Sequence, residues 1–262
     1  MKKFTWLIAL AALAGIIIFF QSKVDRVENS NTPSPTPINN QDTQKASPEV
    51  LFTTSTISQS DAFYKIKAEY PQFDNISASF SQKIDLFMKE RVGLFKSEAA
   101  EAFPAGKNPD VPFDFTASWK EVQANDKYIS FVIKMGYYVG GATGNEESRA
   151  FNYDIVGKKE ITINDFLAGS QNALNKLSEI SEQKVASKIK STDVPIDQFI
   201  MAAIRAGTAP DWENFKEFNF TNNSLVVYFQ KYQVAPGAAG SIAITITKPE
   251  LAQAAIFSDY LK

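Results

Sequence analysis

Carboxylate groups are the main catalytic equipment that this sequence offers, because its 262 residues include neither histidine nor cysteine. Histidine is the commonest general base near neutral pH, and histidine and cysteine are the usual ligands of zinc. Catalytic serines also depend on histidine in most hydrolases. The sequence therefore excludes disulfides, thiolate nucleophiles and hydrolase sites that need histidine. Acid–base chemistry by Asp and Glu remains, together with metal binding through oxygen ligands.

Four carboxylates stand near recognisable turns. Glu146 and Glu147 are neighbours on a predicted strand, so their side chains point to opposite faces and cannot alone form the facing pair of a glycosidase. Asp154 and Asp165 could bind a metal, but no D-x-D-x-D-G loop surrounds them, and we expect Asp165 to be a helix N-cap. We predict no catalytic residue, no metal site and no cofactor.

Two further motifs resemble parts of known active sites. Residues 181–184 and 187–190 both read S-x-x-K, but no K-T-G or S-D-N partner follows, so we expect a solvated helix face. The glycine-rich residues 140–144 lead into a strand and lack the Lys-Ser/Thr of a phosphate-binding loop. Glycines that permit positive φ in a wide turn explain them.

Tyrosines and polar residues around this glycine-rich turn are the candidate binding groups. Adjacent tyrosines on a strand face opposite ways, so one of Tyr137 and Tyr138 should point outward. Exposed tyrosines suit contact with a sugar or a protein, and packing in the core is the alternative. The candidate binding residues are Tyr137, Tyr138, Thr143, Asn145 and Tyr232.

The N-terminus resembles a membrane segment. Lys2 and Lys3 precede an apolar run over residues 4–20, which as a helix would be about 25 Å long, at the short end of what spans a bilayer. The positive charges predict a cytoplasmic N-terminus. We predict a single-pass membrane anchor over residues 1–21, with the rest of the chain extracytoplasmic. Cleavage as a signal peptide near Ala12 to Gly15 is the alternative, and it would give a secreted protein.

The remaining chain predicts a linker and an α+β fold. Residues 22–60 are rich in Pro, Ser, Thr and Asn and should be disordered. Apolar residues recur at helical spacing over 76–95, and strands alternate over 113–119, 129–137 and 151–155. We expect antiparallel sheets, not βαβ units, with helices packed on them in two adjoining modules, 61–155 and 156–262. A net charge of −2 without a basic run argues against a nucleic-acid partner.

Four segments carry a family resemblance: GGATGN at 140–145, FNYD at 151–154, GKKEITINDFL at 157–167 and VVYFQKYQVAPGAAG at 226–240. They resemble the extracytoplasmic domain of the RsiV anti-sigma factor family, and similar domains precede some bacterial peptidoglycan deacetylase domains. The resemblance implies a cell-envelope domain that binds a partner, with lysozyme sensing as the best-understood case. Thr143 stands where the family often has histidine. Only Met1 to Lys3 precede the apolar run, too few to hold a sigma factor, and we expect no deacetylase domain here.

Our prediction from the sequence is a membrane-anchored extracytoplasmic domain that binds or senses and is not an enzyme. Its partner would be a cell-wall glycan or an envelope-active protein such as lysozyme, with the membrane contacted through the N-terminal helix. The alternative is a carboxylate-dependent cell-envelope hydrolase. A third hypothesis is a purely structural module of a larger envelope complex.

Overall fold

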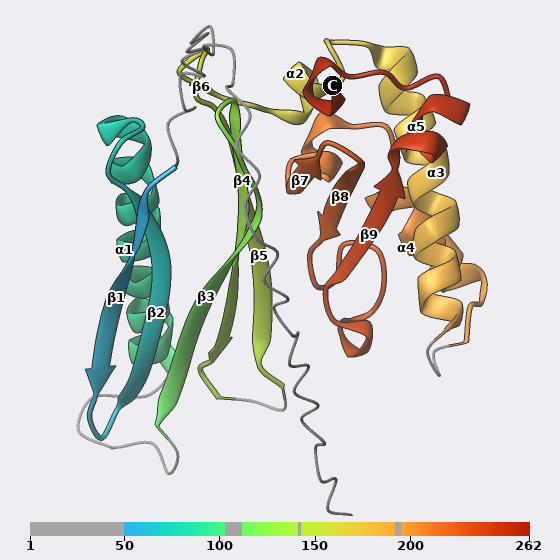
Figure 1. Cartoon of the computed structure of the whole chain (residues 1–262). Helices are drawn as coiled ribbons and strands as arrows, with labels where there is room; N and C mark the ends of the chain where they lie inside the picture. The colour runs from blue at the N-terminus through green and yellow to red at the C-terminus, as the bar shows by residue number, and fades with distance from the viewer. Residues whose placement is uncertain (1–49, 103–111, 141–142, 192–194) are drawn as a thin grey trace, which may run out of the picture. The chain divides into compact units, whose positions relative to one another are not determined.

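Two β-sheets organise the part of the chain that the structure describes (Figure 1). The structure is a computed structural model, and it describes residues 50–102, 112–140, 143–191 and 195–262, all within the compact unit of residues 46–262. The predicted membrane segment 1–21 and most of the predicted linker lie outside these ranges. None of the helices that are described has both the length and the apolar character that crossing a bilayer requires.

The first sheet has six strands in sequence order. They are β1 Phe52–Ser60, β2 Tyr64–Phe73, β3 Phe113–Ala124, β4 Tyr128–Tyr138, β5 Asn145–Asp154 and β6 Lys159–Glu160. The β2–β3 pair is parallel and the other neighbours are antiparallel. The prediction of antiparallel sheets without a βαβ unit is therefore wrong at this pair. The helix α1, Ala78–Ala102, is about 38 Å long and returns the chain to the end of the sheet at which β2 began.

The sheet begins earlier than the sequence predicted. Strand β1 lies inside the expected linker of residues 22–60, and its FTTSTISQS sequence is polar because it is an edge strand with few inward side chains. Ile57 is one that packs against the core. Strand β2 also continues through Pro71, although proline cannot donate a hydrogen bond to a neighbouring strand. Pro71 pairs with Thr54 of β1 and lies beyond Ala68, the last residue of β2 that pairs with β3.

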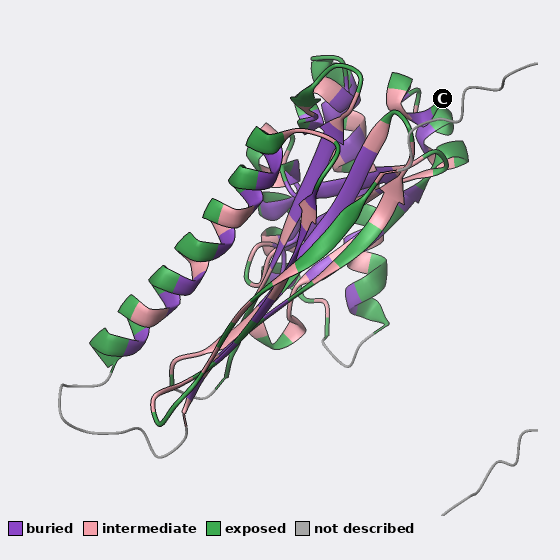
Figure 2. Cartoon of the chain, turned by 60° about the vertical axis from the view of Figure 1, so that its left-hand side comes forward, coloured by how far each residue is buried: buried purple, intermediate pink, exposed green. Residues whose placement is uncertain are grey.

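Helix α1 covers one face of this sheet. Its buried residues recur at three- and four-residue spacing, as predicted, and face the sheet (Figure 2). Aromatic rings fill the interface: Phe131 stacks on Phe151 with ring centres 5.1 Å apart, and Phe80 on Tyr153 at 4.4 Å. Ser77 precedes the first helical residue, Ala78, and its hydroxyl accepts a hydrogen bond from the backbone N–H of Phe80 in the first turn.

The second sheet is antiparallel in the order β7-β8-β9 and carries the remaining helices. Its elements and their neighbours are α2 Ile163–Phe166, α3 Gln171–Lys190, α4 Gln198–Gly207, η1 Trp212–Phe215, β7 Phe218–Thr221, β8 Ser224–Phe229, η2 Gly237–Ala239, β9 Ile242–Thr247, α5 Lys248–Gln253 and η3 Asp259–Leu261. Strands β7 and β8 form a hairpin, in which Thr221 pairs with Ser224 around the Asn222-Asn223 turn. Helix α3 buries one apolar side, which includes Leu174, Leu177, Val185 and Ile189.

The apolar side chains of α4 do not all lie on its buried face. Phe199 is 74% exposed, while Ile200 and Ile204 are buried. The helix begins at Gln198 after an Asp197 N-cap, so Phe199 lies in the first turn, outside the stripe of Ile200 and Ile204.

The two sheets meet at β4 and β5, which are buried on both faces. Val132 and Ala150 form a small apolar cluster with Tyr228 of the second sheet. Beside it, the amide of Asn219 donates to the carbonyl of Phe131 at 2.9 Å, and the amide of Asn152 donates to the carbonyl of Phe218 at 2.7 Å. The predicted α+β class with helices on sheets is thus confirmed. The predicted boundary between two modules after residue 155 stays a prediction. Strand β6 follows that boundary in the sequence but pairs with β5 of the first sheet.

Candidate functional site

Two of the predicted binding residues come together around Lys231. The ammonium group of Lys231 donates to the carbonyl of Gly144 at 2.7 Å and lies 3.5 Å from the hydroxyl of Thr143. It also lies 5.3 Å from the ring centre of Tyr232, a cation–π contact. Tyr232 is 66% exposed. The glycine-rich turn and the loop after β8, although 87 residues apart, thus form one surface corner.

Glycines make this corner possible. The ring of Tyr232 lies directly against Gly237, where a Cβ atom would collide with it. Tyr232 itself has a φ of 70°, which is strained for a residue other than glycine. Gly240, with a φ of 67°, approaches the carboxylate of Glu146 so closely that a Cβ would lie 2.6 Å from its oxygen. The family-like loop sequence is therefore explained by close packing.

The other three predicted binding residues lie elsewhere on β4 and β5. Tyr137 pairs with Asn145 and stacks on Phe115, and burial raises the pKa of Tyr137. This is the core-packing alternative for Tyr137. Tyr138 is half-buried at the end of β4, and Asn145 is exposed at the start of β5. Binding at all five residues stays a prediction.

All four candidate carboxylates have structural partners, and three of them lie on or next to β5. Glu147 forms an ion pair with Arg91 of α1, and Glu146 accepts a hydrogen bond from the backbone N–H of Ser241. Asp154 accepts from the backbone N–H of Gly157 at 2.7 Å and closes the turn before β6. Each fixes a turn or a neighbouring element.

Asp165 is not the N-cap that the sequence predicted. The N-cap of α2 is Thr162, and Asp165 is the third residue of the helix, the other half of a capping box. One carboxylate oxygen accepts from the N–H and hydroxyl of Thr162, at 2.9 and 2.6 Å, and the other accepts from Lys159 at 3.0 Å. Burial raises the pKa of Asp165, but these hydrogen bonds outweigh it and hold the pKa below its usual value.

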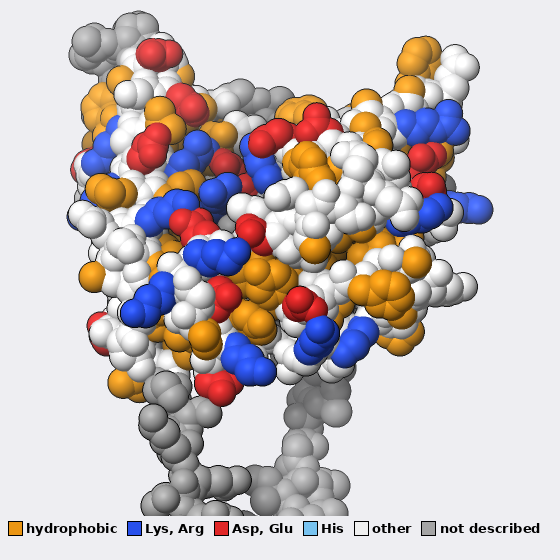
Figure 3. All heavy atoms as spheres, turned by 90° about the horizontal axis from the view of Figure 1, so that it is seen from above, with side chains coloured by type: hydrophobic (Ala, Val, Ile, Leu, Met, Phe, Trp, Pro, Cys, Tyr) orange, Lys and Arg blue, Asp and Glu red, His pale blue; other side chains and the backbone are white. Residues whose placement is uncertain are grey.

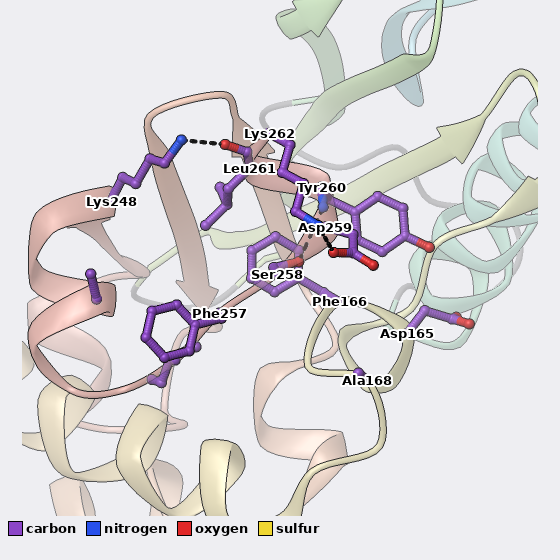
Figure 4. A pocket seen from close by; sticks show the side chains of 12 residues that line it. Asp165, Phe166, Ala168, Lys248, Phe257, Ser258, Asp259, Tyr260, Leu261 and Lys262 are labelled. Atoms are coloured by element: carbon purple, nitrogen blue, oxygen red, sulfur yellow. Dashed lines mark hydrogen bonds and ion pairs between the residues drawn. The ribbon is translucent and has the colours of Figure 1, made fainter.

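Asp165 lies on the wall of a cavity of about 510 Å³ near the C-terminal residues (Figure 4). This volume is within the range of small-molecule sites. Phe166, Ile256 and Leu261 supply a buried apolar floor, while Phe257 is 72% exposed at its edge. Charged groups stand around the apolar surface; they are Asp165, Lys248, Asp259 and Lys262. Lys248 donates to the carbonyl of Leu261 at 2.5 Å, and Lys262 forms an ion pair with Asp259.

Tyr260 connects this cavity to further titratable groups. Its ring stacks on Phe166 with centres 6.2 Å apart. Burial is the main cause that raises the pKa of Tyr260; Lys159 opposes it, and Asp165 and Asp154 add to it. The pKa of Lys159 is raised by its hydrogen bond to Asp165. Tyr260 therefore lies on the cavity wall, while Lys159 acts on it from outside the lining.

A second cavity, of about 380 Å³, lies on the other side of α2. We call it the Trp212 cleft; its lining includes Arg149, Asn152, Glu160, Asn164, Trp212, Glu213 and Lys216. Glu217, which is only 6% exposed, lies behind it and accepts from Arg149 at 2.6 Å and from the backbone N–H of Ala150 at 2.8 Å. Burial raises the pKa of Glu217, although the charge of Arg149 opposes this.

Sequence reasoning missed both cavities. Glu217 had a usable signal, because it is a charged residue inside the aromatic run Phe215 to Phe220, where burial is expected. Tyr260 and Asp259 had none, because the tertiary packing of the C-terminal residues on α2 creates their cavity. On the face shown in Figure 3, acidic and basic side chains are interspersed with hydrophobic ones. Among the described residues, no group of three or more Asp or Glu side chains is placed to hold a metal ion.

The sequence matches two family descriptions. Residues 164–248 match the family "Protein of unknown function (DUF3298)", and residues 57–146 match "Deacetylase PdaC". A curated relative, the peptidoglycan-N-acetylmuramic acid deacetylase PdaC of Bacillus subtilis (strain 168), is 26% identical over 250 residues. The match covers 94% of this chain and 50% of that protein, so the chain spans about half the length of its relative.

Two solved structures share the fold. A DUF3298 family member from Bacteroides fragilis NCTC 9343 has a TM-score of 0.52 at 12% identity, over 78% of this chain and 92% of that one. A DUF3298 family protein from Pseudomonas aeruginosa PAO1 has a TM-score of 0.55 at 11% identity, over 79% and 94%. At these identities the likeness concerns the fold alone.

These matches correct the functional prediction. We expected a non-catalytic binding or sensing domain and no enzyme, and the match to a named peptidoglycan deacetylase overturns both expectations. It favours the alternative, a cell-envelope hydrolase. The matches support a related domain arrangement and, coarsely, a link to bacterial peptidoglycan. The resemblance to the anti-sigma factor family stays a prediction.

Proposed function

We propose that the protein is a cell-wall hydrolase that removes N-acetyl groups from peptidoglycan, with the cavity beside Asp165 as its active site. The observation that carries this proposal is the match to the peptidoglycan deacetylase over 94% of the chain. Since the chain spans half of that relative, the activity, the substrate and the site are all proposals for this chain.

The reaction needs only water as a second reactant. Water attacks the carbonyl carbon of the acetamido group, the C–N bond breaks, and acetate and a free sugar amine leave. A base must take a proton from the water, and donors must stabilise the oxygen that becomes negative. The amine nitrogen takes up a proton as it leaves.

Groups around the cavity can supply these roles. Asp259 is exposed at the cavity wall and is the proposed base. Tyr260 keeps its proton near neutral pH, because burial raises its pKa, so its hydroxyl can donate to the developing oxyanion. The apolar floor, which includes Phe166, suits the acetyl methyl group and the C–H face of a sugar ring. Asp165 holds the wall in place through the capping box.

Acetate release from purified peptidoglycan tests the proposal. The full chain should release acetate, and Tyr260→Phe should release much less while keeping the cavity lined by an aromatic ring. Tyr64→Phe removes a hydroxyl from a half-buried tyrosine of β2 and should leave the rate unchanged. Absence of acetate release from the unaltered chain, or equal rates for both variants, would contradict the assignment.

We also propose that the protein works outside the cytoplasm, held at the membrane by the apolar residues 4–20. The basic Lys2-Lys3 pair before that run and the peptidoglycan-linked relative support this location. Protease added to intact cells after wall digestion should cleave the chain if it is outside. Full protection of the chain in intact cells would contradict the location.

A further inference from the structure

The Trp212 cleft and the proposed active site share one wall. The end of α2 contributes Asp165 and Phe166 to the first cavity, together with Ala168 two residues later. The N-cap Thr162 and the first helical residues, Ile163 and Asn164, line the cleft. The two cavities are therefore separated by a single helical turn. A ligand that is a polymer of repeating units could contact both.

Trp212 is the first residue of the short helix η1, whose ends are fixed by hydrogen bonds. Asp211 is the N-cap of η1 and accepts from the backbone N–H of Glu213 at 3.0 Å. The amide of Asn214 donates to the carbonyl of Ala209 at 3.0 Å. The indole is partly buried against the hydrophobic core between the second sheet and its helices, so part of its surface packs there and part remains accessible.

The charges that line the cleft are paired with one another or with nearby groups. Arg149 pairs with the buried Glu217 at 2.6 Å, and Lys216 pairs with Glu213 at 3.1 Å. Glu160 pairs with Lys83 of α1 at 2.6 Å. A site whose charges balance in pairs favours a neutral ligand with many hydroxyl and amide groups over a strongly charged one.

The floor of the cleft is rigid. Asn152 donates to the carbonyl of Phe218 at 2.7 Å and accepts from the hydroxyl of Ser130 at 2.7 Å. Both carboxylate oxygens of Glu217 are used, one by Arg149 and one by the backbone of Ala150. The cleft is thus preformed, which lowers the entropic cost of binding.

We infer that the Trp212 cleft is a second glycan subsite, which binds an uncharged N-acetylated sugar of the same strand whose neighbouring sugar enters the first cavity. The inference rests on the proposed function for the identity of the strand. An accessible indole offers an apolar face to the C–H side of a pyranose, and exposed polar side chains such as Asn164 and Glu213 can bind its hydroxyl and amide groups. The Trp212 cleft therefore makes the protein prefer longer glycans.

Calorimetric titration of the full chain with N-acetylglucosamine oligomers tests the inference. The tetramer should bind about tenfold tighter than the monomer, and Trp212→Ala should remove most of that difference. Phe199→Ala is the matched control, because Phe199 is an exposed aromatic of α4 that lines neither cavity, and it should keep the difference. Equal affinity for monomer and tetramer in the unaltered chain would overturn the subsite.

A second variant guards against misfolding of Trp212→Ala. Asn164→Ala changes an exposed side chain of α2 that lines the cleft, and it should weaken tetramer binding several-fold without weakening monomer binding. Unchanged tetramer affinity in both variants would overturn the subsite. Length-dependent binding without acetate release would contradict the proposed function and leave the subsite standing. Acetate release without length-dependent binding would overturn the subsite and leave the proposed function standing.

Discussion

The two cavities on either side of α2 differ in how their polar groups are held. In the first cavity an apolar floor is surrounded by charged groups at the surface, where Asp259 and Lys262 form an exposed ion pair. In the Trp212 cleft the floor is locked by buried polar groups, because Glu217 accepts from Arg149 and Asn152 donates to the carbonyl of Phe218. Accessible groups can exchange protons with a substrate, whereas locked groups mainly define a shape. The comparison assigns chemistry to the first cavity and recognition to the second.

The largest expected effect is the loss of acetate release when the proposed base of the first cavity is replaced. Asp259→Asn should lower the rate of acetate release by about 10³-fold, because the amide cannot take a proton from water. Glu213→Gln in the Trp212 cleft should lower it far less. The measurement is the initial rate with purified peptidoglycan at one protein concentration. Similar losses in both variants would remove the functional difference between the cavities. Asp74→Asn, at a residue that lines neither cavity, controls for added amides.

The next effect concerns the rigid floor of the Trp212 cleft. Glu217→Ala should lower the free energy of unfolding by about 3 kcal/mol, because it leaves the guanidinium of Arg149 and the backbone N–H of Ala150 without their partner. Urea unfolding followed by circular dichroism measures this. A loss below about 1 kcal/mol would show that the floor does not depend on Glu217.

A smaller effect is the pH dependence that Glu217 contributes. Burial raises the pKa of Glu217 in the folded state above its ordinary value of 4.5. The folded state therefore binds this proton more tightly than the unfolded state, and the stabilisation is present at low pH and is lost as pH rises through the raised pKa. Glu217→Gln cannot titrate. Its stability relative to the unaltered chain should rise as pH increases above 4.5, as measured by urea unfolding at several pH values.

The contribution of Glu217 is the difference in unfolding free energy between the unaltered chain and Glu217→Gln at each pH. A comparison is needed because other carboxyls have a lowered pKa in the folded state: hydrogen bonds to Lys184 and Thr247 lower the pKa of Glu250 to about 2. Their contribution is present in both proteins and cancels. A constant difference between the two proteins over the pH range would show that Glu217 has the same pKa in both states.

The smallest expected effect concerns the wall that the two cavities share. Asp165→Ala removes the carboxylate half of the α2 capping box and should cost about 1 kcal/mol in unfolding free energy. Acetate release should fall only moderately, because Asp165 positions the wall. Loss of stability equal to that of Glu217→Ala would place the main support of the shared wall at Asp165 instead.

Local sequence patterns predicted much of the fold. The spacing of Phe80, Ile84 and Met88 gave α1, and the alternation of Ile129, Phe131 and Ile133 gave β4, because burial of one face imposes those periods. The parallel β2–β3 pair was not predicted, because the residues of a strand do not determine which other strand it pairs with. The polar edge strand β1 was read as linker for a similar reason: an edge strand needs little apolar surface.

The candidate sites were less predictable. Thr143 and Tyr232, which lie in two of the family-like segments, both contact Lys231, and binding at these residues stays a prediction. Both cavities instead depend on tertiary contacts, such as the stacking of Tyr260 on Phe166, which lie 94 residues apart. The role of Asp165 was also mispredicted from the sequence. Whether it is the N-cap or the third residue of the helix depends on the residue at which α2 begins. From the sequence, an enzyme was only the alternative hypothesis, and the match to a peptidoglycan deacetylase, not a motif, placed it ahead of the binding domain.

Mass spectrometry of peptidoglycan fragments after incubation with the purified full chain tests the central claim most directly. Our account predicts fragments lighter by one acetyl group each, accumulating with time, and nearly none with Asp259→Asn. Fragments of unchanged mass in both reactions would contradict the account.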